Sequence, residues 1–102
     1  MGKINSRAKG HTFERDIAQE LRDMGYSCVT SRSESRRLDD AGVDLVDDTE
    51  FYFQLKRVEA LRPVDDILAS MPPDKTRVVL HKRSRKEAVV SMSWTDFKRL
   101  ML

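Results

Sequence analysis

Apolar residues recur with helical spacing near the start of the chain. Phe13, Ile17 and Leu21 follow one another at intervals of four residues, which places them on one face of a helix and predicts a helix over residues 8–24. A glycine follows directly, as is typical of a helix C-terminus. The residues before this helix, 1–7, are mostly polar, and we expect them to form a flexible arm.

Further along the chain, shorter apolar runs predict strands. We expect five strands, over residues 26–30, 43–46, 50–57, 76–81 and 88–92, a loop over 31–42, a helix over 62–70 and a last helix capped by Ser93 or Thr95. This order predicts an α/β fold in which helices flank a mixed central β-sheet, within a single domain of 102 residues. The short turn at 47–49 predicts that the strands on either side of it pair as an antiparallel hairpin.

Charge is distributed unevenly along the chain. The net charge is +2, but residues 1–37 carry +3, residues 38–74 carry −7 and residues 75–102 carry +6. Basic ends and an acidic middle are suited to bind a polyanion and a cation, respectively. The alternative is that these charges simply cover the surface of a small domain.

Cysteine content and hydropathy restrict the environment of the protein. Cys28 is the only cysteine, so an intrachain disulfide and a zinc site built from several cysteines are excluded. No apolar run approaches the ~20 residues that span a bilayer, and the N-terminus has no apolar signal core. We therefore expect a cytoplasmic protein with no membrane contact.

The predicted hairpin carries polar residues that are suited to phosphodiester hydrolysis. Gln54 and Lys56 are two residues apart and share one face of their strand, while Leu55 faces the core. Antiparallel pairing would bring Asp44 beside them. Oxygen ligands of this kind hold Mg²⁺, and a nearby lysine can orient the attacking water or stabilise the transition state. Glu14 on the first helix could add a second carboxylate.

The same residues also have an ordinary interpretation. An aspartate before a turn and a lysine on a strand are common features of proteins without any active site. In this chain, however, Asp44 interrupts an apolar strand, and Gln54 and Lys56 interrupt an aromatic one. Polar groups in strands that are otherwise buried need a reason, and an active site is one.

Several short segments stand in an order and at a spacing that match a known family. They are residues 4–10 followed by Glu14-Arg15, then 21–26, 42–46, 53–59, 81–87, 89–92 and Asp96-Phe97, and they extend over nearly the whole chain. With them the chain resembles the archaeal and phage-type Holliday junction resolvases of the PD-(D/E)xK nuclease superfamily. The resemblance implies a restriction-endonuclease-like core and cleavage of four-way DNA junctions in a phage or prokaryotic host cell.

The resemblance also implies roles for individual residues. Glu14, Asp44 and Gln54 would face a Mg²⁺ ion, for which Mn²⁺ could substitute, and Lys56 would be the catalytic lysine. Ser33 or Ser35 lies where archaeal relatives have a functional serine. The family acts as a homodimer on branched DNA and needs no small-molecule cofactor. The C-terminal apolar residues Trp94, Phe97, Leu100 and Met101 then belong either to the core or to a dimer interface.

Gln54 departs from the family pattern, which has an acidic residue at this position. A glutamine carbonyl can still bind Mg²⁺, but it carries no charge. The chain is then an active variant, a weakened enzyme or an inactive junction-binding module. A related nuclease that acts on flaps, ends or foreign duplex is a further alternative.

DNA affinity depends mainly on cations that neutralise phosphates. The candidate DNA-binding residues are Arg7, Lys9, Arg15, Arg32, Ser33, Ser35, Arg36, Arg37, Arg57, Lys82, Arg83, Arg85 and Lys86. The tract from Lys82 to Lys86 is the densest, although charged residues also occupy ordinary turns. We find no base-reading module, so we expect recognition of DNA shape rather than sequence.

Overall fold

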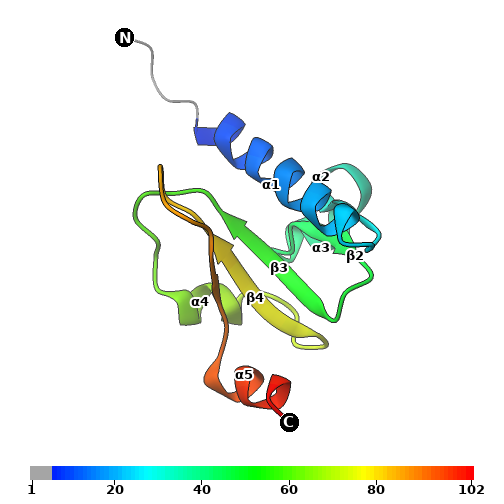
Figure 1. The fold of residues 1–102 in the computed structure, drawn as a ribbon, viewed down its shortest axis with the longest axis vertical. Helices are drawn as coiled ribbons and strands as arrows, with labels where there is room; N and C mark the ends of the chain where they lie inside the picture. The colour runs from blue at the N-terminus through cyan, green and yellow to red at the C-terminus, as the bar shows by residue number, and fades with distance from the viewer. Residues whose placement is uncertain (1–5) are drawn as a thin grey trace.

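The first helix, α1 (Ser6–Asp23), covers one side of the protein in a computed structural model that describes residues 6–102 (Figure 1). Phe13 and Ala18 are buried on its inner face, which confirms the predicted helical stripe. Gly25, with φ 102°, ends the helix, and the Tyr26 N–H donates back to the Leu21 carbonyl at 3.0 Å.

The start of this helix corrects the expected flexible arm. Ser6 and Arg7 already belong to α1, so the arm cannot extend to residue 7. The rest of the expected arm, residues 1–5, lies outside the described residues.

Strands form two separately paired sets. β1 (Cys28–Thr30) pairs antiparallel with β2 (Leu45–Asp47). β3 (Phe51–Lys56) pairs parallel with β4 (Thr76–His81), which pairs antiparallel with β5 (Val89–Ser91). The predicted α/β fold is confirmed, with mixed strand directions and flanking helices. The strands form two sheets instead of one central sheet.

The predicted hairpin between β2 and β3 is wrong. Val46 in β2 pairs with Val29 in β1, while Phe53 in β3 pairs with Val78 in β4. The turn at 47–49 is short enough for a hairpin, but β2 pairs with β1, and its neighbour Asp44 bonds to β3 through its N–H and the Phe53 carbonyl at 2.8 Å. The helix α4 (Val64–Ala69) instead provides the crossover that parallel pairing of β3 with β4 requires.

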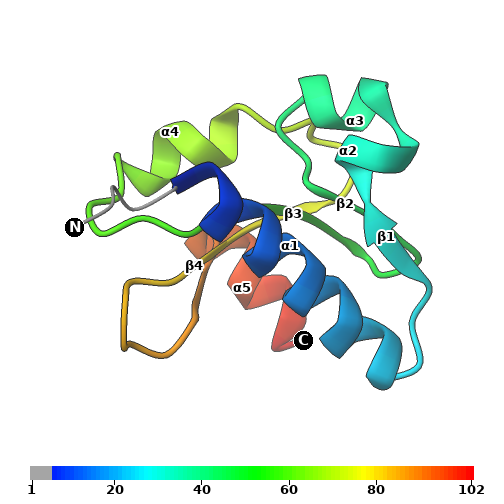
Figure 2. The same ribbon diagram turned by 90° about the horizontal axis from the view of Figure 1, so that it is seen from above.

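Helices occupy both faces of the β3–β4 pair (Figure 2). Leu55 and Leu80 are buried in one cluster with Phe13 of α1. Tyr52 and Val79 are buried in a second cluster with Ile67 of α4. Alternate residues of each strand therefore serve two cores, because successive side chains point to opposite faces.

The expected loop over 31–42 is also wrong, because two short helices form there. α2 (Ser31–Glu34) is followed by α3 (Arg36–Asp40). The Ser35 hydroxyl caps α3 by accepting a hydrogen bond from the Leu38 N–H at 3.3 Å, and Leu38 is buried. The charged side chains of this segment lie on the solvent-facing sides of the two short helices. Because they outnumber the apolar residues, the sequence of the segment showed no helical pattern.

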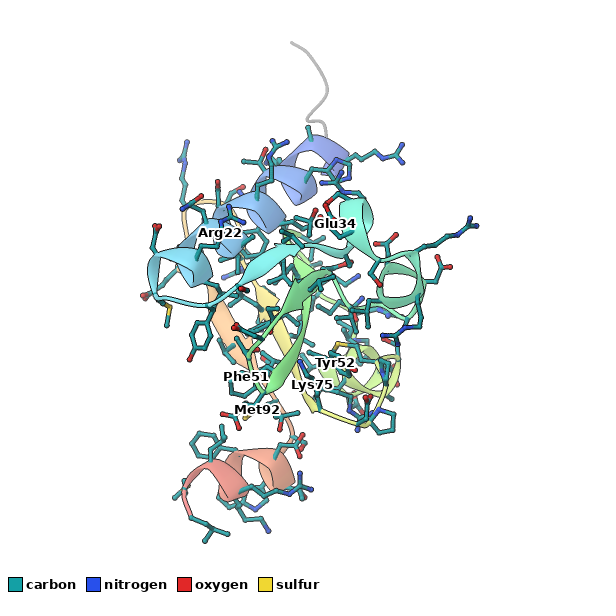
Figure 3. The ribbon with its side chains drawn as sticks, turned by 90° about the vertical axis from the view of Figure 1, so that its right-hand side faces the viewer. Arg22, Glu34, Phe51, Tyr52, Lys75 and Met92 are labelled. Atoms are coloured by element: carbon teal, nitrogen blue, oxygen red, sulfur yellow. The ribbon has the colours of Figure 1, made fainter. Side chains whose placement is uncertain are left out.

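The last helix, α5 (Trp94–Leu100), stands clear of the rest of the molecule (Figure 3). Ser93 caps it, as one of the two predicted alternatives, and accepts from the Asp96 N–H at 3.0 Å. Trp94 is 65% exposed and Met101 is 67% exposed. The expectation that these residues form the core is therefore wrong for this chain, and the interface alternative stays a prediction. Across residues 6–102, none of the helices has the length and apolarity needed to cross a bilayer.

Candidate active site

Asp44 is fixed in place by three hydrogen bonds just before β2. Its N–H donates to the Phe53 carbonyl at 2.8 Å, and its own carbonyl accepts from the Ser31 N–H at 2.9 Å. Its carboxylate Oδ2 accepts from the Leu55 N–H at 2.7 Å. The side chain of Asp44 thus takes the place of a backbone acceptor along the edge of β3. This bond brings Asp44 beside β3 without the predicted hairpin.

The electrostatic environment of Asp44 opposes its ionisation. Burial is the main reason that the pKa of Asp44 rises from 3.8 to about 6, and the charge of Glu14 raises it further. The Leu55 N–H and the charge of Lys56 act in the opposite direction. A buried carboxylate next to a second carboxylate is a place where a bound cation would be favourable.

Glu14 on α1 is a second carboxylate near Asp44, because its charge raises the pKa of Asp44. Its side chain is 15% exposed, and its Oε1 lies 3.4 Å from Nε of Arg32 in α2. Glu14 and Asp44 are close enough to interact electrostatically, and their joint role at a metal site stays a prediction. Arg32, expected to contact DNA, pairs with Glu14 and neutralises part of this acidic charge.

Lys56 is the last residue of β3 and is half-buried. Its charge is close enough to lower the pKa of Asp44. The four salt bridges of the described chain do not include a pair between Lys56 and Asp44. We refer to Glu14, Asp44 and Lys56 together as the carboxylate centre.

Gln54 is placed differently from the other predicted site residues. It is buried, and its carbonyl Oε1 accepts from the Ser70 hydroxyl at 3.3 Å. Gly42 adopts a φ of 78°, and a Cβ there would lie 3.5 Å from the same oxygen. The side chain of Gln54 is thus packed between Gly42 and the end of α4.

Within residues 6–102, no group of three or more His, Cys, Asp or Glu side chains is gathered as a metal site. The anionic oxygen donors of the carboxylate centre are Glu14 and Asp44. Two carboxylates fit Mg²⁺, which commonly keeps several waters and binds one or two carboxylates together with substrate phosphates. The Gln54 carbonyl oxygen lies beside Gly42 and 3.3 Å from the Ser70 hydroxyl, whose shorter bond, at 2.6 Å, goes to the Ile67 carbonyl.

The predicted DNA-binding residues lie in three groups around α1. Arg7, Lys9 and Arg15 lie on α1 itself. Arg32, Ser33, Ser35, Arg36 and Arg37 lie on or between α2 and α3. Arg57, Lys82, Arg83, Arg85 and Lys86 lie after β3 and in the β4–β5 connection.

Local hydrogen bonds occupy both candidate serines. Ser33 Oγ donates to the Thr30 carbonyl at 3.0 Å, and Ser35 is the cap of α3. Each serine therefore has a structural role in this short helical segment.

Sequence reasoning missed two residues that support the site. Ser31 is fully buried, donates its hydroxyl to the Val43 carbonyl at 2.6 Å and holds Asp44 through its N–H. Glu59 accepts from the Ser84 N–H at 2.9 Å and pairs with Arg57 at 3.4 Å, which ties the basic connection to the end of β3. No sequence pattern marks either residue, because both act on backbone groups that are distant in sequence.

Comparison of the chain with protein-family models, with curated proteins and with solved structures gives no match. The resemblance to the junction resolvases therefore stays a prediction, and the proposed function depends on the geometry of the carboxylate centre.

Proposed function

We propose that this protein is a metal-dependent endonuclease that cuts branched DNA, with four-way junctions as its main substrate. The observation that carries the proposal is the position of Asp44. Its buried carboxylate is fixed by the Leu55 N–H and lies within electrostatic reach of both Glu14 and Lys56. Groups with a strongly shifted pKa and a specific charged neighbour are concentrated at functional sites.

Asp44 and Glu14 would hold a Mg²⁺ or Mn²⁺ ion in this proposal. The ion would supply an acidified water and a positive charge for the phosphate oxygens. Lys56 then orients that water and stabilises the negative charge that builds up on the phosphate. Asp44 remains rigid during the reaction because Phe53, Leu55 and Ser31 hold it on three sides.

We also infer that the fold is a small restriction-endonuclease-like core. Support comes from the arrangement of α1 over β3, with β4 parallel to β3 after the α4 crossover. Asp44 and Lys56 both contact the region where β3 ends, as the resemblance implies for the catalytic pair.

A homodimer would allow two active sites to cut opposed strands of one junction. The exposed apolar side chains of Val89, Val90, Trp94 and Phe97 on β5 and α5 support a contact there, since large exposed apolar patches mark interfaces. We expect Trp94→Glu combined with Phe97→Glu to convert a dimer to a monomer in sedimentation experiments. An unchanged mass would place the dimer contact elsewhere or exclude it.

Gln54 supports a second candidate function, an inactive DNA-junction-binding module. Its carbonyl oxygen lies beside Gly42 and Ser70, and it adds no negative charge to the carboxylate centre. In that case the basic groups around α1 would still bind DNA, but no phosphodiester bond would be cut.

Cleavage assays separate these functions. Four-way, flap and linear DNA would each be incubated with the full chain in Mg²⁺ or Mn²⁺. Junction cutting that Asp44→Asn abolishes without loss of junction binding would support the proposal. Equal cutting of linear duplex would favour a less selective nuclease. Binding without any cutting, followed by activity in Gln54→Glu, would show that the native chain is the inactive module.

A further inference from the structure

A groove lies beside the first half of α1. It encloses about 620 Å³, and Lys9, Thr12, Phe13, Asp16, Arg57 and Lys82 line it. We call it the basic groove. Residues of the first half of α1 form one side of this groove, and Arg57 after β3 and Lys82 after β4 form the other.

The basic groove and the carboxylate centre are neighbours. Phe13 lines the groove, while Glu14, the next residue, belongs to the centre, so their side chains leave α1 about 100° apart. Arg57 lines the groove, and Lys56 before it belongs to the centre. The start of α1 thus separates the two sites, and a DNA chain that crosses it could reach both.

Three cations, Lys9, Arg57 and Lys82, line the groove. Arg57 is held at 3.3 Å from the Ser84 hydroxyl and at 3.4 Å from Glu59, with a side chain that is only 16% exposed. Lys82 is half-buried and donates to a carbonyl. Of the ion pairs between described residues, none involves Lys9 or Lys82. Their uncompensated charge favours an anion such as a phosphate.

The rest of the groove differs from a simple phosphate site. Phe13 and Ala8 contribute apolar surface, and the lysine stems add more. Asp16 lies seven residues beyond Lys9 along α1, which is about 10 Å along the helix axis. The groove therefore combines cations, an apolar surface from Ala8 and the exposed edge of Phe13, and a carboxylate that can accept a hydrogen bond from a base. A paired duplex offers phosphates but no free base face, whereas an unpaired nucleotide offers both.

We propose that the basic groove holds one nucleotide of an unpaired DNA strand, with its phosphate at Lys9, Arg57 and Lys82 and its base on the apolar surface. This inference rests on the proposed DNA-cutting function and adds to it a preference for branch points where a strand is displaced. The groove would hold the strand next to the phosphate that is cut at the carboxylate centre.

Binding in EDTA tests the groove separately from cleavage. The affinity of the full chain for a 20-nucleotide single strand and for a duplex of equal length would be measured by fluorescence anisotropy at several salt concentrations. The combined Lys9→Ala and Lys82→Ala variant should lose two of the three cations around the one phosphate in the groove. We expect the slope of log K against log salt for the single strand to fall by about 0.7 in magnitude, the value for one phosphate of a single strand. Duplex binding should change less.

Two further variants control for charge and for shape. Lys98→Ala with Arg99→Ala removes the same charge from α5, at the opposite end of the molecule (Figure 1), and should leave the slope unchanged. Thr12→Trp fills the groove from an exposed position and should weaken single-strand binding without any change of charge.

The outcomes distinguish this inference from the proposed function. Equal slopes for the groove variant and the α5 control, or an equal loss of duplex binding, would overturn the groove proposal even in a chain that cuts junctions. Unaltered single-strand binding by Thr12→Trp would also overturn it. A groove that behaves as expected in a chain that never cuts DNA would support the groove while the nuclease proposal fails.

Discussion

The two flanks of α1 hold opposite charges, and the protein holds them in opposite ways. In the carboxylate centre, Asp44 is buried and fixed by three hydrogen bonds from distant segments. In the basic groove, Lys9 and Lys82 are only half-buried and lack a carboxylate partner within the described chain. The fold therefore fixes the buried Asp44 carboxylate with hydrogen bonds, while it leaves the two groove lysines without a carboxylate partner. A catalytic step needs a fixed geometry, whereas binding of a polyanion depends mainly on charge, so this difference between the two sites is expected.

Substitutions that remove one fixed group should have the largest effects. We expect Lys56→Ala to lower junction cleavage by about 10²- to 10⁴-fold, because a positioned lysine acts in the transition state. Junction affinity should change little, since many other cations remain. Single-turnover cleavage and anisotropy measure the two quantities. A decrease in affinity that accounts for the whole loss of cleavage would contradict the assigned role.

The burial of Asp44 should be visible as a pH dependence of stability. Its pKa is about 6 in the folded protein and near 3.8 when exposed, so the folded state binds more protons between these values. The free energy of unfolding should therefore fall as the pH rises from about 4 to 6, by about 3 kcal/mol from this group, and then stay level. Urea unfolding of the wild type and of Asp44→Asn, compared across this range, isolates the effect.

In that comparison Asp44→Asn should be more stable than the wild type at pH 8 and similar to it at pH 4. The amide oxygen of asparagine can still accept from the Leu55 N–H. Glu20→Gln removes an exposed charge from α1 and serves as a control that should follow the wild-type curve. Parallel curves for the wild type and Asp44→Asn would show that burial of Asp44 carries little cost.

Added Mg²⁺ should offset the loss of folding stability that ionised, buried Asp44 causes near neutral pH. A cation bound between Glu14 and Asp44 favours the folded state, by about 2.7 kcal/mol at a concentration 100 times its Kd. We expect the melting temperature of the wild type to rise with added Mg²⁺ and that of Asp44→Asn to stay constant. Chelation with EDTA should reverse the increase. Equal stabilisation of both proteins would place the ion elsewhere.

The ion pair between Arg32 and Glu14 should give the smallest effect. Arg32 is 39% exposed, so Arg32→Ala should cost about 0.5 kcal/mol without metal. Saturating Mg²⁺ should reduce that cost, because the ion takes over neutralisation of Glu14. Arg36→Ala breaks the exposed pair with Asp40 and provides a matched control. A cost that Mg²⁺ leaves unchanged would mean that Arg32 acts apart from the cation site.

The sequence by itself determined α1 and the two central strands. The four-residue spacing of Phe13, Ile17 and Leu21 predicted α1, and apolar runs predicted β3 and β4 to within one or two residues. The interruption of apolar strands by Asp44 and Lys56 was enough to mark both residues, because a polar group in a buried strand is costly wherever the strand is placed.

Only the tertiary structure decided which elements became partners. β2 pairs with β1 instead of β3, Gln54 turns to Ser70, and Arg32 reaches Glu14. Each of these contacts joins residues that are far apart in sequence or that compete with a local alternative. The spacing of apolar residues shows which face of a segment is buried in the core. Which other segment it pairs with depends on the free energy of the whole packed chain. That choice placed the Asp44 carboxylate at the edge of β3.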